Sequence, residues 1–450
     1  MMSESNPMLV DSFQPPSIPE LHASAGDLPG RILLATRVYF DRGDECTRAE
    51  AATSKGQKVE ISIRFAAPPD LSYVCVHCPE LKQAYFAEEP RVVRSEKQFL
   101  LVHLPLTFGP RFTLWEDERN EYFLYTAAAK PSLRWIPAPK PRGVTPAKIG
   151  ICCPDDADEC ILAALSVPRT GDGYELHTYT SKSVDWAVKP ARLEKPPKRE
   201  ELLPASAHKV VPLGGTIMAW VHLLKGVLTC NVATEDDVAS VSFIRLPHRM
   251  PGNQSEYISP WKIRDVICSR GSLKFVEVED LYTKEDRAPA APSDPDIFYD
   301  GLDSDTDDLA DSLPNPPTWI GWRAVIWNKA LSEKFWRKGC EAHVRDILVK
   351  NPDHLALLAQ LGRNDSVVHD SAALINLLPN FPTLSIFGDD VVYMNSLVKK
   401  NTHQAWVVAI DLTNRIVMSL APYPGSEKNP DCPHVPSVLS KYLNCASANY

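Results

Sequence analysis

The sequence predicts a mainly β protein: an antiparallel, multi-hairpin, propeller-like scaffold of about five to six degenerate blades, with short helices in the C-terminal third. Short runs of β-branched and aromatic residues, most of them five to nine residues long, recur along the chain. Polar turns join neighbouring runs into hairpins, and the pattern lacks the crossover helices that a parallel sheet requires. The chain also has 40 prolines and only 20 glycines among its 450 residues, which favours many rigid turns.

The first part of the chain is expected to consist of a tail and two β regions. Residues 1–29 contain proline and serine and are expected to form a flexible N-terminal tail, and residues 30–145 an N-terminal β region. Within that region, residues 59–65 alternate apolar and polar side chains, which is the period-two pattern of a half-buried strand. Residues 146–286 follow as a central β region. Its most apolar stretch, 210–233, is interrupted by proline and glycine and is expected to form strand, turn and strand rather than a membrane span.

The last part of the chain combines an acidic insert with a third β region. Residues 287–317 are rich in Asp, Ser and Pro and are expected to be a disordered insert. Residues 318–425 are expected to form a C-terminal β region, and residues 426–450 a C-terminal tail. Apolar residues at helical spacing predict helices over residues 329–338 and 352–378.

The charge of the chain is concentrated in its acidic insert. The chain has 57 acidic and 48 basic residues, which gives a net charge of −9. Residues 290–318 hold eight aspartates and no lysine or arginine, so the remaining chain is close to neutral. Such a body lacks the basic surface that binding to nucleic acid or to an anionic membrane requires, and neither is predicted as a partner. Ser304 and Thr306 in the insert are candidate phosphorylation sites.

The ends of the chain and its cysteines predict a soluble intracellular protein of the cytoplasm or the nucleus. Residues 1–19 have neither the basic nor the apolar region of a signal peptide, and no transmembrane segment is expected. The eleven cysteines are odd in number and widely spaced, so reduced core thiols are expected rather than a disulfide framework.

Two short motifs resemble metal sites but fail on their spacing. Cys75 and Cys78 form a CxxC pair, yet no second pair follows. An offset of three also places the two thiols on opposite faces of a strand. The acidic run from Asp303 begins like a calcium loop, but its sixth position is Asp308 instead of glycine and its twelfth is Pro314 instead of glutamate. No metal ligand is therefore assigned.

Catalytic motifs are also missing from the sequence. The chain contains no GxSxG elbow, GxGxxG turn, P-loop or HExxH helix. Structural roles are favoured for the histidines in or beside expected strands, which are His77, His103, His222 and His248. The same holds for Cys152, Cys153 and Cys160, which flank an acidic turn. The sequence thus predicts no catalytic residue, no cofactor and no enzymatic activity.

Several blocks of the chain resemble one known family. The first runs over residues 218–232, with the sequence Met-Ala-Trp-Val-His-Leu-Leu-Lys-Gly-Val-Leu-Thr-Cys-Asn-Val, and is followed by an arginine-to-proline strand. Other blocks lie at residues 49–54, 72–77, 264–266, 271–277, 381–386, 389–393 and 405–411. Together they are similar to the family called domain of unknown function 1618, which is greatly expanded in grasses. The resemblance implies an all-β scaffold similar to the propellers associated with F-box proteins, and because the family has no assigned chemistry it implies no catalytic or binding residue.

The same blocks also predict local structure. Large aromatic residues are expected to anchor the core from strands; these are Trp220, Phe275, Tyr393 and Trp406. Gly226 and Gly271 are expected in hairpin turns at positive φ.

Two functions are compatible with this pattern. The leading hypothesis is a non-catalytic protein-binding or adaptor module, because propeller-like folds present their loops on one face and no catalytic constellation is seen. The protein partner is not identified by the sequence. The alternative is an enzyme or small-ligand receptor with a central pocket, whose titratable groups could include His222 or Asp265.

Overall fold

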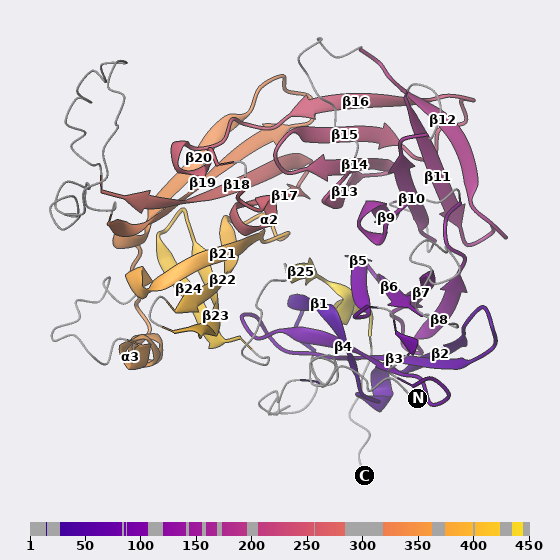
Figure 1. The fold of residues 1–450 in the computed structure, drawn as a ribbon, viewed down its shortest axis with the longest axis horizontal. Coiled ribbons are helices and arrows are strands. Elements are labelled where there is room, and N and C mark those ends of the chain that lie inside the picture. Colours follow the sequence, from indigo (N-terminus) through magenta and orange to yellow (C-terminus); the bar gives the residue numbers. More distant parts are fainter. Residues whose placement is uncertain are drawn as a thin grey trace, which may run out of the picture.

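The computed structural model describes residue 15 and residues 28–82, 85–86, 88–106, 120–140, 144–154, 159–168, 173–195, 206–255, 257–283, 318–361, 374–398, 401–423 and 434–443. Most of the expected N-terminal tail and the whole acidic insert, with Ser304 and Thr306, lie outside these residues. The described chain is mainly β, as predicted, and its strands form sheets of nine, eight, four and four strands. Each of the two larger sheets contains two four-stranded units joined edge to edge, so that six such units lie around a common centre (Figure 1). We call these units blades 1 to 6.

The first three blades come from the N-terminal half of the chain. Blade 1 contains β1 (Ile32–Phe40), β2 (Ala49–Ala52), β3 (Lys58–Arg64) and β4 (Ser72–His77). Blade 2 contains β5 (Arg91–Glu96), β6 (Phe99–Pro105), β7 (Asn120–Thr126) and β8 (Ser132–Ile136). Blade 3 contains β9 (Ile149–Cys152), β10 (Ile161–Ser166), β11 (Tyr174–Thr180) and β12 (Ala187–Leu193).

The other three blades follow in chain order. Blade 4 contains β13 (Lys209–Gly214), β14 (Ile217–His222), β15 (Gly226–Asn231) and β16 (Ala239–Arg245). Blade 5 contains β17 (Arg264–Ser269), β18 (Ser272–Tyr282), β19 (Trp319–Ala330) and β20 (Arg337–His343). Blade 6 contains β21 (Leu377–Leu384), β22 (Val391–Val398), β23 (Asn401–Asp411) and β24 (Ile416–Pro422). Blades 2 to 6 are antiparallel meanders, whereas in blade 1 the strands β1 and β4 are parallel.

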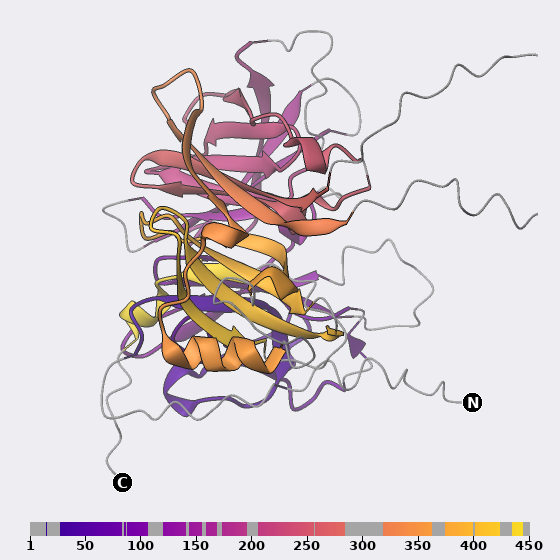
Figure 2. The same cartoon turned by 90° about the vertical axis from the view of Figure 1, so that its left-hand side faces the viewer.

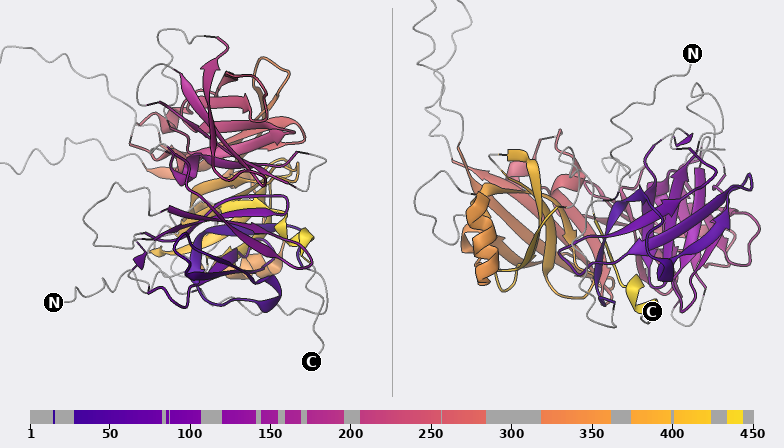
Figure 3. Two further views of the ribbon diagram at one scale, coloured as in Figure 1. Left: turned by 90° about the vertical axis from the view of Figure 1, so that its right-hand side faces the viewer. Right: turned by 90° about the horizontal axis from the view of Figure 1, so that it is seen from below.

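The ring of blades is closed by a strand from the C-terminus. Strand β25 (His434–Ser437) pairs antiparallel with β1, and it contacts both β21 of blade 6 and β5 of blade 2. The innermost strands β5, β9, β13, β17, β21 and β25 therefore contact one another in a complete circle. The first and last parts of the chain, indigo and yellow, lie side by side at this point (Figures 1 and 3).

Most strands carry apolar side chains on both faces, because each face packs against a neighbouring blade. In the described residues, six apolar clusters each fill the space between two neighbouring blades. In β6, for example, Leu100 and Val102 face blade 1, whereas Phe99 and Leu101 face blade 3. The predicted anchors are confirmed: Trp220, Phe275, Tyr393 and Trp406 are all buried, each in a different cluster.

Helices are short and few, and one predicted helix is wrong. The described α-helices are α2 (Pro260–Ile263) and α3 (Pro352–Leu361), and α3 lies against the outside of blade 6 (Figure 2). Residues 329–338, expected as a helix, instead end β19, turn and begin β20. Their apolar spacing reflects a hairpin that packs Trp336 against the cluster between blades 4 and 5. Likewise, the predicted helix over residues 352–378 holds as far as Leu361, but residues 377–378 begin β21.

Single-turn 3-10 helices complete the described elements; they are η1 (Glu45–Thr47), η4 (Pro146–Lys148), η5 (Pro251–Asn253), η7 (Val344–Asp346), η8 (Leu374–Asn376) and η9 (Leu439–Tyr442). Neither α-helix of the described chain combines the length and the apolar character needed to cross a membrane.

The expected region boundaries do not coincide with the blades. The acidic insert separates β18 from β19, two strands of blade 5 that pair along their lengths, and the backbone N–H of Thr283 donates to the carbonyl of Thr318 across its ends (2.8 Å). Residues 426–450, expected as a tail, contain β25 and η9, with His434 and Leu439 buried. A tail is therefore the wrong interpretation for residues 434–443.

Candidate functional site

A central cavity of about 360 Å³ opens where the innermost strands end. Blades 2 to 6 and strand β25 contribute to its wall, because each innermost strand or the turn after it reaches the centre of the ring. Its lining residues are Arg94 to Lys97, Ile151, Cys153, Lys209 to Gly215, Ile267, Cys268, Arg270, Gly271, Ile386 and His434 to Val438. The volume falls in the range of small-ligand sites, and most of the wall surface is apolar.

Arg94 is the most deeply placed charge of this cavity. The pairing of β5 with β6 shifts in register between Val92 and Arg94. Its Nη1 donates to the carbonyl of Val93 (2.6 Å) and its Nη2 to the carbonyl of Ala147 (2.8 Å), while its Nε is buried without an acceptor. Burial alone lowers the pKa of Arg94 to about 10, and the described residues place no carboxylate within ion-pair distance of it. Arg94 is therefore a half-buried charge whose hydrogen-bond partners among the described residues are backbone carbonyls.

Glu96 is the last residue of the same strand, and burial disfavours the charged form of its carboxyl group as well. Burial raises the pKa of its carboxyl group to about 7, although the neighbouring Lys97 ammonium acts against this shift. Near neutral pH a large fraction of the group is consequently protonated and can donate a hydrogen bond. Lys97 turns the chain into β6 at φ 48°, and its Nζ lies 3.4 Å from the carbonyl of Cys153.

Arg270 stands on the opposite side of the ring, in the hairpin of blade 5. It adopts φ 50°, its Nη2 donates to the carbonyl of Phe387 (3.4 Å), and its guanidinium packs against Gly388. Within the described residues it forms no ion pair. Lys209 differs, because its Nζ is 2.7 Å from the Oδ1 of Asp265 and its charge is compensated.

The wall residues from β25 are held by hydrogen bonds. His434 Nε2 bonds to the Oδ1 of Asn395, and burial lowers the pKa of His434 to about 3, which keeps the ring neutral. Its Nδ1 is buried without a partner among the described residues.

The thiols at the cavity are poor nucleophiles. Burial raises the pKa of Cys268 to about 11 and that of Cys153 further still, so both remain protonated at neutral pH. Cys75 and Cys78 lie elsewhere, in apolar clusters on opposite faces of blade 1, as their spacing predicted. The described residues contain no group of three or more His, Cys, Asp or Glu side chains that could hold a metal ion.

The two titratable residues named for a pocket lie outside the cavity wall. Asp265 is buried, and its Oδ2 accepts the backbone N–H of Leu384 (2.9 Å), so that it ties blade 5 to blade 6. His222 lies 4.4 Å from His208, measured between ring centroids, and burial lowers the pKa of both rings. Sequence reasoning missed Arg94 and Glu96 instead, although charged residues in a strand that is buried on both faces are a usable signal.

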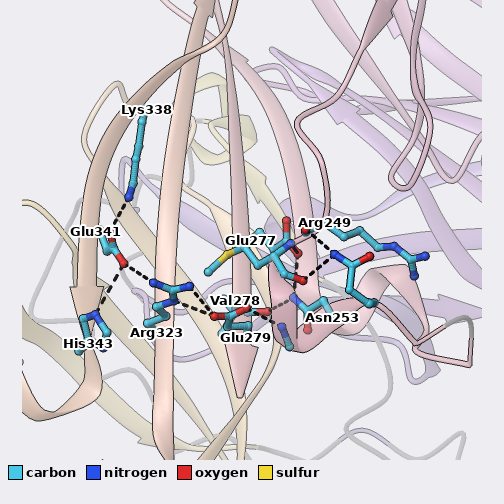
Figure 4. A network of polar contacts seen from close by, with 12 residues as sticks. Arg249, Asn253, Glu277, Val278, Glu279, Arg323, Lys338, Glu341 and His343 are labelled. Atoms are coloured by element: carbon cyan, nitrogen blue, oxygen red, sulfur yellow. Dashed lines mark hydrogen bonds and ion pairs between the residues drawn. The ribbon is translucent and has the colours of Figure 1, made fainter. Parts of the chain in front are cut away.

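A polar network in blade 5 has a structural role (Figure 4). Glu277 Oε1 accepts the backbone N–H of Met250 (2.9 Å) and the side-chain amide of Asn253 (2.8 Å), which fixes the chain before β17. Arg323 lies between Glu279 and Glu341 and bonds to both (2.7 and 2.9 Å). The polar groups of this network are hydrogen-bonded to one another, so that few donors or acceptors remain for a ligand.

The outer groove, as we call it, is a second hollow of about 590 Å³ between blade 4 and the β19–β20 hairpin. Phe335 is 71% exposed at its edge, and Trp336 Nε1 donates to the carbonyl of Arg245 (2.8 Å), which holds the hairpin in place. Arg245, His248, Lys329 and Lys334 line it against a single acid, Glu333.

Six four-stranded blades closed by a C-terminal strand around a central cavity define a β-propeller. Residues 220–393, which run from β14 to β22, match the model of the family described as Protein of unknown function (DUF1618). The match supports, over these residues, the resemblance seen in the sequence.

The other comparisons add no function. No curated protein matches the chain. Among solved structures, the chain is similar to the "Structure of apo AztD from Citrobacter koseri", with 11% identity, a TM-score of 0.30, and coverage of 90% of this chain and 98% of that chain. This similarity is too low to support an argument about fold or function.

Proposed function

We propose that the protein is a non-catalytic binding module that takes a small ligand into the central cavity. The observation that carries this proposal is Arg94, a half-buried residue at the cavity wall whose guanidinium has only backbone carbonyls as partners among the described residues. Burying a charge without a counterion costs free energy, and such costs are concentrated at functional sites. A ligand in the cavity would supply the missing compensation.

The chemistry of the other wall residues favours binding over catalysis. The thiols of Cys153 and Cys268 are held protonated by burial, which removes them as nucleophiles. The ring of His434 is held neutral with a pKa of about 3, too low for an efficient general base at neutral pH.

The proposal is tested by screening a fragment library against the full-length protein with ligand-detected NMR. Val438→Trp fills the cavity from a half-buried wall position, and Phe335→Ser changes the outer groove as a matched control. We expect fragments that bind the wild type and the Phe335→Ser protein but lose binding with Val438→Trp. Fragments that bind all three proteins equally would contradict a central site.

The protein-binding adaptor remains a second candidate, and the outer groove favours it. Its exposed Phe335 and its excess of basic residues suit a partner segment that carries an apolar side chain among acidic residues. We expect a partner recovered near stoichiometry with the tagged protein to be lost with Phe335→Ser and with Lys334→Glu, but retained with Val438→Trp. Equal recovery with all four proteins, measured by quantitative mass spectrometry, would exclude the groove as its site.

A further inference from the structure

We propose that the ligand of the central cavity is an organic anion with an apolar body. This inference rests on the proposed function, which requires only that the cavity binds some small ligand. It specifies the charge and the shape of that ligand from the groups of the wall.

The uncompensated charges of the wall are positive. Arg94 and Arg270 lie on blades 2 and 5, on opposite sides of the ring, and their contacts in the described residues are with backbone carbonyls and Gly388. Lys209 is neutralised by Asp265 and adds nothing to the balance. A guanidinium presents planar N–H donors that match a carboxylate or a phosphate, so an anion is the ligand that these two residues favour.

Glu96 is the one acid on the wall, and it does not reverse the balance. Because burial raises the pKa of its carboxyl group to about 7, about half of the groups are protonated at pH 7 and most of them below it, and the protonated form acts as a neutral donor toward an anionic ligand. At higher pH the ionised carboxylate repels an anion. Anion binding should therefore be stronger at pH 6 than at pH 8.

The rest of the wall fixes the apolar part of the ligand. Aliphatic side chains from four innermost strands surround the space; they include Ile151, Val210, Leu213, Ile267 and Val435. A strongly hydrated anion without an apolar part would leave this surface in contact with water and forgo its contribution of about 25 cal/mol per Å². The cavity of about 360 Å³ accommodates an alkyl or aryl group with one anionic head.

The test compares three probes with the same alkyl chain and different head groups: octanoate, octanamide and octylammonium. Binding to the full-length protein is measured by isothermal titration calorimetry below the micellar range. We expect octanoate to bind at least about tenfold more tightly than either of the other probes. Val438→Trp should abolish this binding, which places the probe in the cavity.

Variants of the wall separate the proposed role from a general loss of structure. Arg94→Met keeps the length of the side chain and should weaken octanoate binding at least about tenfold, whereas Arg245→Met in the outer groove should leave it unchanged. Because Arg94→Met can also disturb the fold, Glu96→Gln provides a second readout. In the wild type the affinity for octanoate should fall up to about tenfold from pH 6 to pH 8, and in Glu96→Gln this dependence should disappear while binding is retained.

The possible failures are distinguishable. If octanamide or octylammonium binds the cavity as tightly as octanoate, the ligand is not selected for negative charge, and the inference is overturned while the proposed function stands. Unchanged octanoate affinity in both Arg94→Met and Arg270→Gln would overturn it equally. If no probe and no library fragment binds in a way that Val438→Trp abolishes, the proposed function itself fails.

Discussion

The hydroxyl oxygen of Ser437 lies 2.7 Å from that of Ser95, so that a hydrogen bond joins the last described strand, β25, to the innermost strand of blade 2. Strand β25 also pairs with β1 through four residues, and Leu439 just beyond it is fully buried between blades 1 and 2. The closure of the ring thus depends on residues near the C-terminus, and the cavity loses one part of its wall without them.

Removal of β25 should destabilise the whole propeller. A protein that ends at Tyr423 lacks β25 and the buried Leu439 and Leu443, each of which should contribute about 2–5 kcal/mol to the free energy of unfolding. We expect a loss of at least about 5 kcal/mol or failure to fold, measured by urea denaturation. A protein that ends at Leu443 keeps β25 and is the control. Equal unfolding midpoints for the two proteins would show that the C-terminal strand does not support the ring.

The buried ion pair of blade 5 should be far more sensitive to mutation than a surface pair. Arg264 Nη2 lies 2.7 Å from Glu277 Oε2, and both side chains are fully buried. Glu277→Leu leaves the Arg264 charge without its carboxylate and should cost about 3–5 kcal/mol. Lys338→Met removes the exposed partner of Glu341 and should cost about 1 kcal/mol or less. Chemical denaturation of the two variants measures the difference, and similar losses would contradict the buried pair's importance.

Buried neutral histidines should make the protein sensitive to acid. Burial lowers the pKa of His103 and His208 to about 4 and that of His434 to about 3, whereas an unfolded chain titrates near 6.5. Between pH 6.5 and about 4 the unfolded state therefore binds more protons than the folded state, and the free energy of unfolding falls as the pH falls. Each group contributes at most about 1.4 kcal/mol per pH unit.

Glu96 acts in the opposite direction over part of this range. Its raised pKa means that the folded state binds the extra proton between about pH 4.5 and 7, which stabilises the fold as the pH falls. Three histidines outweigh this one group, so a net loss is expected in urea denaturation at pH 7.5, 6 and 5. His103→Gln should reduce the pH dependence. Identical pH profiles for wild type and His103→Gln would rule out this origin.

The sequence predicted the hairpin architecture because polar turns join neighbouring runs of β-branched and aromatic residues, but it did not reveal the closing strand. Residues 434–437 include Pro436, and proline normally argues against a strand within a sheet. Here it is tolerated because β25 is innermost: one of its edges pairs with β1, and its other edge lies at the cavity. Which edge of a strand is left unpaired depends on how the ring of blades closes. The local sequence pattern carries no information about that closure.

A search for sequence motifs could not identify the cavity, for a related reason. Its two guanidinium groups, those of Arg94 and Arg270, come from blades 2 and 5 and lie more than 170 residues apart in the chain, so no fixed spacing marks them. Asp265 was named as a possible titratable group of a central pocket, yet its carboxylate binds Lys209 and the backbone of Leu384. A polar residue of a strand either stabilises the packing of blades or forms part of a site. The groups that face it decide between these roles, and they come from the neighbouring blade.

Two glycines of the family blocks should fail for different reasons when a side chain is added. Gly271 has φ 72°, as predicted, and a Cβ there meets open space, so Gly271→Ala should cost about 1–2 kcal/mol through backbone strain alone. The prediction of positive φ at Gly226 is wrong. A Cβ there would lie 2.4 Å from the Phe243 ring and 2.6 Å from the carbonyl of Ile244, so Gly226→Ala should cost about 1–3 kcal/mol through overpacking.

Asparagine separates the two causes, because it tolerates the left-handed region but is larger than alanine. Gly271→Asn should therefore be more stable than Gly271→Ala, whereas Gly226→Asn should be less stable than Gly226→Ala. Thermal and urea denaturation of the four variants give the comparison. The same order at both positions would mean that one cause, strain or crowding, governs both turns.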